Sequence, residues 1–373
     1  MRRIRRIAMS VAASAMILPL AGCGVLNATG SSSSSAASPT KGDDVTVGLL
    51  LPETANTRYE KFDHPIIKAK VDSLTQHKGR LEYANAGADA AKQATQMQKM
   101  IDDRVDVILL DAVDSHAIAG EVKKARNAGI PVIAYDRLAE GPITAYVSFD
   151  NELVGEVQGR SLMDALGSDV KASEKIVMMN GAPTDPNAKQ FKKSALAELN
   201  GKVTIAASFD TKDWKPENAE ANMVRAIKDI GAYNIAAVYS ANDGMAGGIV
   251  KALKAAGVVQ LPPITGQDAD LDAVQRIVAG EQYMTVYKPY PDEAEAAAEM
   301  ALAKIQGKDI QFDALTPDKV DSPTDKGIPA QLVQVSALTK TNIRDTVVAD
   351  GIYRISEICT AAYRADCDAI GLK

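Results

Sequence analysis

The sequence is poor in histidine, cysteine and tryptophan, with three, three and one of these residues among its 373. His64, His77 and His116 are scattered and lack metal-ligand spacing, and so few thiols disfavour a metal site. A positive charge excess is also missing. The net charge is −6, and no basic cluster remains beyond the N-terminal arginines, which excludes nucleic acid as a partner.

The short motifs of common enzyme classes are absent as well. The sequence contains no G-x-S-x-G, H-E-x-x-H, phosphate-binding loop or G-x-G-x-x-G pattern. We therefore expect no enzyme activity, no cofactor and no metal. One enzymatic alternative stays open, because paired carboxylates such as Asp114 and Asp268 could in principle cleave a glycoside.

Long apolar runs are missing from the body of the chain, so we expect no membrane-spanning segment there. The N-terminus is different, because four arginines in its first six residues precede an apolar run from Ile7 to Leu20, as in an export signal. The run ends in Leu20-Ala21-Gly22-Cys23, which resembles the lipobox of bacterial lipoproteins, whose cysteine is acylated after cleavage. We predict a lipoprotein signal over 1–23 with lipidation at Cys23. An ordinary secretory signal is the alternative.

The stretch 24–42 contains Ser31 to Ser35 and buries no apolar residue, which predicts a flexible tether. The folded part is expected to begin near Asp43 or Asp44 and is long enough for two domains. Cys359 and Cys367 lie in a C-terminal tail over 358–373. In an exported protein this pair favours a local disulfide.

Short runs of Val, Ile and Leu alternate with amphipathic stretches, and the pattern occurs twice. Continuous apolar strands separated by helices predict parallel sheets covered on both faces, here in two similar doubly wound α/β lobes. The first series has strands at 45–51, 80–84, 105–110, 131–135 and 145–147, and helices at 65–74, 90–102 and 117–128. The second has strands at 175–179, 203–206, 235–239 and 263–266, and helices at 187–199, 217–230, 244–256 and 271–279.

Polar side chains follow the predicted strands in both series. Because ligands bind beyond the carboxyl ends of parallel strands, two facing lobes would present one cleft lined by these residues. Carboxylates, amides and cations can bond sugar hydroxyls, and aromatic rings can cover the apolar faces of a pyranose. The residues are Arg58, Tyr59, Asp114, Asp136, Arg137, Asn187, Lys189, Asp213, Trp214, Asn242, Asp243, Gln267, Asp268 and Lys288.

Purely structural roles compete at several of these positions. Asp243 could cap the helix that follows it, and Asp136 with Arg137 could form a structural ion pair. Trp214 could fill a core. Their grouping at strand ends in both series favours a ligand site over these separate explanations.

Residues 44 to about 357 resemble the sugar-binding proteins of bacterial ABC importers, a family that includes ribose-, arabinose- and galactose-binding proteins. The resemblance is closest to its xylose-binding branch, and it extends over both lobes. Matching segments are Arg58-Tyr59, Tyr135-Asp136-Arg137, Ser148-Phe149-Asp150-Asn151-Glu152, Asn187-Ala188-Lys189, Trp214-Lys215-Pro216-Glu217-Asn218-Ala219, Ser240-Ala241-Asn242-Asp243, Gly266-Gln267-Asp268-Ala269-Asp270-Leu271 and Met284-Thr285-Val286-Tyr287-Lys288-Pro289.

This resemblance implies a periplasmic binding protein type I fold, in which two lobes are joined by a three-segment hinge and close on one sugar. The N-terminal lobe would comprise 44–148 plus 287–322. The C-terminal lobe would comprise 149–286 plus 323–357. The tail over 358–373 lies outside the resemblance.

The resemblance also implies roles for individual residues. Tyr59 and Trp214 match positions that usually hold stacking aromatics, and Tyr59 stands where the closest relatives carry Trp. The smaller ring could loosen selectivity toward pentoses. The other implied sugar-binding residues are Arg58, Asp114, Asp136, Arg137, Asn187, Lys189, Asn242, Asp268 and Lys288.

The implied function is capture of a monosaccharide, D-xylose or a related aldose, and its delivery to an ABC transporter permease. The protein would be an exported monomer, lipid-anchored to the outer face of the cytoplasmic membrane. Two alternatives stay open. One is a sensor subunit of the same fold, and the other is a receptor for another sugar such as glucose, ribose or fructose.

Overall fold

The structure is a computed structural model that describes residues 40–373. The predicted export signal, Cys23 and most of the predicted tether lie outside these residues. Lys41, assigned to the tether from the sequence, already contacts the folded chain. Its backbone N–H donates to the carbonyl of Ile305 (3.0 Å), and its ammonium lies 2.8 Å from a carboxylate oxygen of Asp106. No helix within 40–373 is long and apolar enough to cross a membrane.

The N-terminal lobe is built on one seven-stranded sheet in the order β10-β11-β5-β4-β3-β1-β2. The strands pair in parallel, except that β10 runs antiparallel to β11. Helices return the chain between β1, β2, β3 and β4, which gives these strands the same direction, whereas a loop without a helix joins β4 to β5. The strands are β1 (Thr46–Leu51), β2 (Arg80–Asn85), β3 (Val107–Leu110), β4 (Val132–Tyr135), β5 (Ala145–Phe149), β10 (Asp318–Val320) and β11 (Ile328–Val333).

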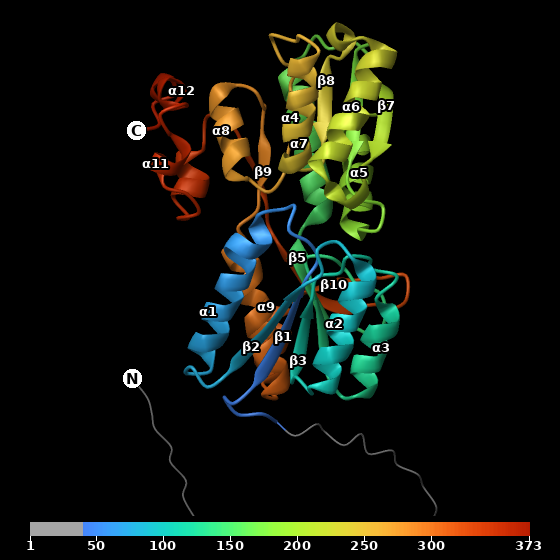
Figure 1. Cartoon of the computed structure of the whole chain (residues 1–373), viewed down its shortest axis with the longest axis vertical. Coiled ribbons are helices and arrows are strands. Elements are labelled where there is room, and N and C mark those ends of the chain that lie inside the picture. Colours follow the sequence, from blue (N-terminus) through green and yellow to red (C-terminus); the bar gives the residue numbers. More distant parts are fainter. Residues whose placement is uncertain (1–39) are drawn as a thin grey trace, which may run out of the picture. The chain divides into compact units, whose positions relative to one another are not determined.

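Both faces of this sheet are covered by helices, as its continuous apolar strands require. Successive side chains of a strand point to opposite faces. Leu49 and Leu51 therefore pack with α1 and α9, whereas Leu50 packs with α2 (Figure 1). The helices are α1 (His64–Leu74), α2 (Ala90–Asp102), α3 (Ala119–Asn127), α9 (Tyr290–Ile305) and α10 (Asp309–Leu315), and the short turn η1 (Tyr59–Asp63) precedes α1.

The C-terminal lobe has a smaller sheet than predicted. Three parallel strands pair in the order β7-β6-β8, and the predicted strand 263–266 contributes only one bridge, between Ile264 and Val238. Helices α4 and α5 pack closely, since a Cβ on Gly155 would lie 2.2 Å from the carbonyl oxygen of Phe191. The elements are β6 (Lys175–Asn180), β7 (Thr204–Asp210), β8 (Ala237–Ser240), α4 (Asn151–Leu166), α5 (Pro186–Leu199), η2 (Lys212–Trp214), α6 (Pro216–Ile230), η3 (Ala232–Asn234), α7 (Asp243–Ala255) and α8 (Leu271–Ala279).

The chain passes between the lobes three times: after β5, after β9 (Thr285–Tyr287) and between β11 and β12 (Ser336–Leu338). The predicted fold class, two α/β lobes with a three-segment hinge, is thus confirmed. The predicted third boundary, between 322 and 323, is wrong. β10 and β11 form an antiparallel pair in the N-terminal sheet, so residues 322–327 are a turn within that lobe. The crossing follows only after Val333.

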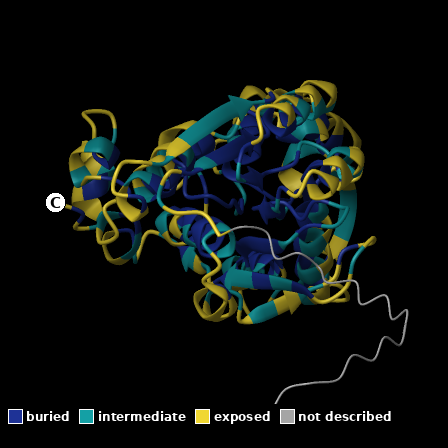
Figure 2. Cartoon of the chain, turned by 90° about the horizontal axis from the view of Figure 1, so that it is seen from below, coloured by how far each residue is buried: buried dark blue, intermediate teal, exposed yellow. Residues whose placement is uncertain are grey.

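The C-terminal segment, defined here as residues 339–373, packs on α8. Val347, Ile358 and Leu372 share one apolar cluster with Ile277 of that helix, so the predicted boundary at 357/358 is not a structural break. Cys359 and Cys367 form a disulfide, the pairing that the sequence favoured. Figure 2 shows dark blue buried residues inside this segment as well as inside the lobes. Its elements are η4 (Arg344–Val348), α11 (Ile355–Ile358) and α12 (Arg364–Ala369).

Candidate functional site

A small cavity lies where strand-end loops of the two lobes meet. Its volume, as the space open to the centres of water-sized spheres, is about 20 Å³. Most of the side chains around it are polar, and they come from both lobes and from the crossing after β9. The lining residues are Glu53, Asn56, Arg58, Tyr59, Asp136, Arg137, Asp185, Asn187, Phe191, Trp214, Asn242, Gln267, Asp268 and Lys288.

Two of the predicted site residues lie elsewhere. Asp114 accepts hydrogen bonds from the backbone N–H groups of His116 (3.0 Å) and Ala117 (2.9 Å), so it closes the turn before α3. Lys189 is exposed on α5, because it follows the cavity-lining Asn187 by two positions and therefore points from another helix face. With Asp114 outside the cavity, it cannot form a carboxylate pair with Asp268 there. The other nine predicted residues line the cavity: Arg58, Tyr59, Asp136, Arg137, Asn187, Trp214, Asn242, Asp268 and Lys288.

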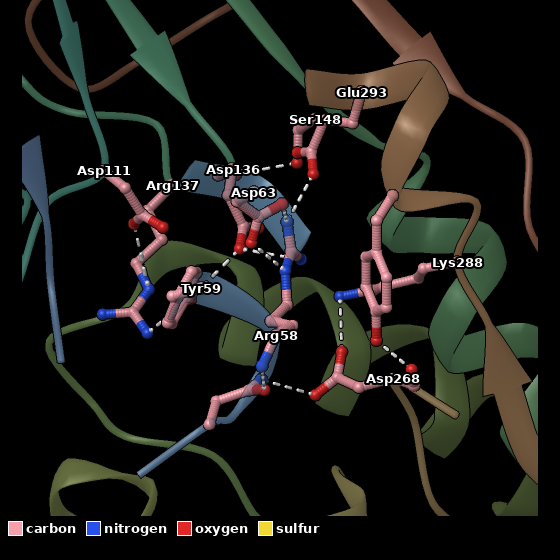
Figure 3. Close-up of polar contacts among 12 residues, drawn as sticks. Arg58, Tyr59, Asp63, Asp111, Asp136, Arg137, Ser148, Asp268, Lys288 and Glu293 are labelled. Atoms are coloured by element: carbon pink, nitrogen blue, oxygen red, sulfur yellow. Dashed lines mark hydrogen bonds and ion pairs between the residues drawn. The ribbon is translucent and has the colours of Figure 1, made fainter. Parts of the chain in front are cut away.

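Arg58 is 1% exposed and is surrounded by three carboxylates (Figure 3). Its Nε lies 2.8 Å from Asp63 Oδ2 and its Nη2 lies 3.0 Å from Asp63 Oδ1, a bidentate pair. Nη2 also donates to Glu293 Oε2 (2.6 Å), and Nη1 lies 3.2 Å from Asp136 Oδ2. Burial raises the pKa of Asp63 and of Glu293 despite the nearby guanidinium. Arg58 therefore neutralises acidic groups beneath the cavity and fixes one carboxylate that lines it.

Asp136 is the carboxylate that Arg58 holds at the cavity wall. Its Oδ2 accepts from the Tyr59 hydroxyl (3.2 Å) and its Oδ1 accepts from Asn187 Nδ2 of the other lobe (3.1 Å). Burial favours a higher pKa, but Arg58, then Lys288 and Arg137, hold the pKa of Asp136 below its ordinary value. Asp136 thus stays ionised and acts as a hydrogen-bond acceptor.

A second chain of polar contacts runs from Arg137 to Trp214. Arg137 Nε lies 3.0 Å from Asp185 Oδ2 and 3.5 Å from Asp111 Oδ1, and Trp214 Nε1 donates to Asp185 Oδ2 (3.2 Å). The indole ring is also held by Gly181, where a Cβ would lie 2.0 Å from the ring. The single Trp is therefore fixed in orientation at the cavity.

The third group of contacts joins the lobes directly. Asp268 Oδ1 lies 3.2 Å from Lys288 Nζ, and Asp268 Oδ2 accepts from Asn56 Nδ2 of the N-terminal lobe (2.9 Å). Lys288 Nζ also lies 5.0 Å from the ring centroid of Phe149. Asp268 belongs to one lobe and receives a donor from the other, so its contacts depend on lobe closure.

Three cavity residues have backbone conformations that non-glycine residues rarely adopt. The φ angles are 56° at Asp136, 57° at Trp214 and 98° at Asp268. Such strain is concentrated at functional sites, where the surrounding structure maintains it. Asp136 follows the end of β4, and Trp214 lies in η2 just after β7, whereas Asp268 follows the isolated bridge between Gln267 and Val286.

Several cavity residues were absent from the predicted site. Glu53 and Asn56 precede Arg58 in the same loop after β1, so position alone could have indicated them. Gln267 was noted as a strand-end residue, and its buried Oε1 has no hydrogen-bond partner among residues 40–373. A buried, unpaired amide oxygen beside a cavity marks Gln267 as free to bond a ligand. Asp185 and Phe191 also belong to this group.

These groups together can bond a small molecule with many hydroxyls. Ionised carboxylates accept, guanidinium and ammonium groups donate, and amides do both, while Trp214 and Phe191 offer apolar surface. Within 40–373, no cluster of three or more His, Cys, Asp or Glu side chains has the geometry to hold a metal ion. The arrangement suits recognition of a polar ring.

Comparison with known proteins places this chain in a family. The family model for the periplasmic binding protein domain matches residues 47–309. The D-xylose-binding periplasmic protein of Escherichia coli strain K12 is 34% identical over 321 residues, which cover 84% of this chain and 93% of that protein. The multiple sugar-binding periplasmic receptor ChvE of Rhizobium radiobacter is 32% identical over 342 residues, covering 85% and 93%.

Solved structures of other proteins have the same fold as this chain. A solute-binding protein of an ABC transporter from Clostridium phytofermentans, solved with bound β-D-glucose, has a TM-score of 0.76 and 24% identity, covering 84% of this chain and 99% of that one. A galactofuranose-binding protein has a TM-score of 0.69 and 20% identity, covering 83% and 99%. The model match and the similarity to the E. coli protein show that the chain belongs to the periplasmic binding protein family.

Proposed function

We propose that the protein is an extracytoplasmic solute-binding lipoprotein that captures one monosaccharide between its lobes. The observation that carries this proposal is the cavity itself, in which hydrogen-bonding side chains from both lobes surround a space beside Trp214 and Phe191. Contacts across the lobes, such as Asn56 to Asp268 and Asn187 to Asp136, support a mechanism in which closure completes this set of groups.

D-Xylose or a related aldose is the favoured ligand. Similarity to proteins named for D-xylose and for multiple sugars supports this choice. Tyr59 is the residue that bears on selectivity, since its hydroxyl contacts Asp136 and Arg137 within the cavity wall. Glucose, ribose and fructose are the other sugars to test.

Capture would begin with the lobes apart, because cavity-lining groups such as Asp136 and Asp268 are almost fully buried between the lobes in this structure. In the open form, ligand hydroxyls would bond the groups of one lobe. Closure would then bring the remaining donors and acceptors, so the ligand binds the closed form better and shifts the population toward it. Sugar hydroxyls would compete for Asp268 and Lys288, which bond each other in this structure.

Isothermal titration of the purified protein with D-xylose, D-glucose, L-arabinose, D-ribose, D-galactose and D-fructose tests the proposal. We expect one or more of these sugars to bind. Asp268→Asn should weaken binding about 10- to 100-fold, since a hydrogen bond to a charged group contributes about 1.5–3 kcal/mol. Asp321→Asn, at an exposed carboxylate, is the matched control and should bind normally. A folded protein that binds none of the six sugars would overturn the proposal.

Delivery of the sugar to an ABC permease, and anchoring through acylated Cys23, complete the proposed function. A diacylated cysteine would hold the protein near the permease, because two acyl chains give stable membrane attachment. Cys23→Ser should move the protein from the membrane fraction to the soluble exported fraction, as measured by immunoblotting of fractionated cells. Equal membrane association of both forms would contradict the anchor.

A further inference from the structure

The C-terminal segment (339–373) is attached to the C-terminal lobe. Figure 1 shows α11 and α12 beside α8. Gln275 of α8 donates to the carbonyls of Glu357 (3.0 Å) and Ile358 (3.4 Å), and Ile358 and Leu372 share a buried cluster with residues of α8. The Tyr287 hydroxyl donates to Asp350 (2.6 Å). The segment therefore moves with this lobe when the hinge opens.

From this position the segment contacts the N-terminal lobe through Tyr353. Tyr353 is 3% exposed, and its ring lies edge-on to Phe62 with centroids 6.0 Å apart. The Lys61 ammonium lies 4.5 Å from the Tyr353 ring centroid and 5.0 Å from that of Phe62. Phe62 in turn stacks on Tyr290, with centroids 5.3 Å apart. Lys61 and Phe62 belong to η1, so this aromatic contact joins the two lobes.

The same turn carries ligand-site residues. Tyr59 begins η1, Arg58 precedes it, and Asp63 at its end forms the bidentate pair with Arg58. A contact between Tyr353 and η1 therefore ties the backbone that carries Arg58 and Tyr59 to the C-terminal lobe. Ion pairs within the N-terminal lobe fix the Arg58 guanidinium itself. Separation of the lobes would pull η1 away from Tyr353.

We propose that Tyr353 is a positioning residue for ligand capture: it holds the turn that carries Arg58 and Tyr59 against the C-terminal lobe and so slows ligand release. This inference rests on the proposed sugar-binding function. The C-terminal segment becomes part of the binding mechanism without touching the ligand. Because the contact forms on closure, it affects dissociation of the closed complex rather than encounter with the open form.

Stopped-flow fluorescence tests the proposal, because Trp214 is the only Trp of the chain and lines the cavity. The probe is whichever sugar of the six-sugar panel binds most tightly. Tyr353→Ala should raise the dissociation rate about 3- to 10-fold, the range expected for an aromatic pair with a nearby cation, and should change the association rate less than about 2-fold. Tyr353→Phe keeps the ring and should restore slow dissociation.

Further variants distinguish loss of the Tyr353 contact from a general loss of stability. Tyr233→Ala removes a tyrosine that is 79% exposed and should leave both rates unchanged. Lys61→Met removes only an exposed charge and should raise the dissociation rate about 2- to 5-fold even if Tyr353→Ala folds poorly. Phe62→Ala combined with Tyr353→Ala should raise the dissociation rate by less than the product of the two single effects, because both remove the contact between these two rings.

The outcomes of these experiments distinguish failure of the sugar-binding function from failure of the positioning role of Tyr353. If the unmodified protein binds no sugar of the panel, the proposed function fails. If it binds sugar and Tyr353→Ala and Lys61→Met both release it at the unmodified rate, the role of Tyr353 is overturned while the function stands. Equal changes in association and dissociation in Tyr353→Ala would also overturn it, because they would indicate altered site structure instead of altered closure.

Discussion

The guanidinium of Arg58 is buried against three carboxylates, and this environment determines what the residue can do. Its nitrogens are occupied by Asp63, Glu293 and Asp136. The residue lines the cavity, but most of its hydrogen-bonding capacity is used within the protein. Its main effect on a ligand is therefore indirect, through the ionised and fixed Asp136.

Arg58→Met should destabilise the fold by about 3–5 kcal/mol, because removing one partner of a buried ion pair leaves uncompensated charge. Urea denaturation of the variant would measure this loss. Arg126→Met, at an exposed arginine of α3, is the matched control and should change stability by less than about 0.5 kcal/mol. A loss below about 1 kcal/mol in Arg58→Met would show that the three carboxylates are neutralised in another way.

Single residues also show what the sequence could predict about the site. The position of Trp214, Asp268 and Lys288 at the cavity was predictable, because each follows an apolar run that the sequence analysis assigned to a strand. Asp111 and Asp114 both follow β3, and the sequence analysis selected Asp114. Asp111 is the residue that is buried beside Arg137, whereas Asp114 caps a turn. Which of two carboxylates three positions apart is buried beside Arg137 depends on the conformation of the turn after the strand. Residue types alone do not determine that conformation.

At the scale of elements, the apolar runs predicted strands and helices wherever polar and apolar residues contrast clearly. Helix α2 was predicted with the observed bounds of 90–102. Two long helices, α4 and α9, were not predicted. In α9 many small residues, mainly alanines, are buried, so the helix lacks the usual contrast between two faces. The boundary at 322/323 was implied by the family resemblance, and the antiparallel pairing of β10 with β11 instead places residues 322–327 in a turn within the N-terminal lobe.

At the scale of the whole molecule, contact between the lobes buries acidic side chains and changes their pKa values. Burial raises the pKa of Glu53 and of Asp185, and it raises that of Asp111 well above its ordinary value. Asp270 lies at the same boundary, where its Oδ1 accepts from Thr57 Oγ1 of the N-terminal lobe (3.3 Å). None of these shifts is visible in the sequence, because burial arises only when both lobes are assembled.

The raised pKa values predict how stability depends on pH. Burial, followed by the charges of Asp268 and Asp272, raises the pKa of Asp270 to about 7. The folded protein then holds a proton that the unfolded chain releases near pH 4, so stability falls as pH rises from about 4 to about 7. The pKa of Asp136 is lowered, so the stability that its ionised form contributes is lost only in more strongly acidic solution. The melting temperature should therefore fall between pH 5 and pH 7.

Asp270→Asn isolates one part of this dependence. The amide can still accept from Thr57 but cannot ionise. The free energy of unfolding of the variant should therefore fall less steeply between pH 5 and pH 7, with a slope smaller by up to about 1.4 kcal/mol per pH unit. Urea denaturation at each pH measures both slopes. Asp229→Asn, at an exposed carboxylate of α6, should keep the slope of the unmodified protein. Identical slopes in Asp270→Asn and the unmodified protein would show that Asp270 is ionised throughout this range, and the closed lobes would then have to tolerate its charge beside Asp268.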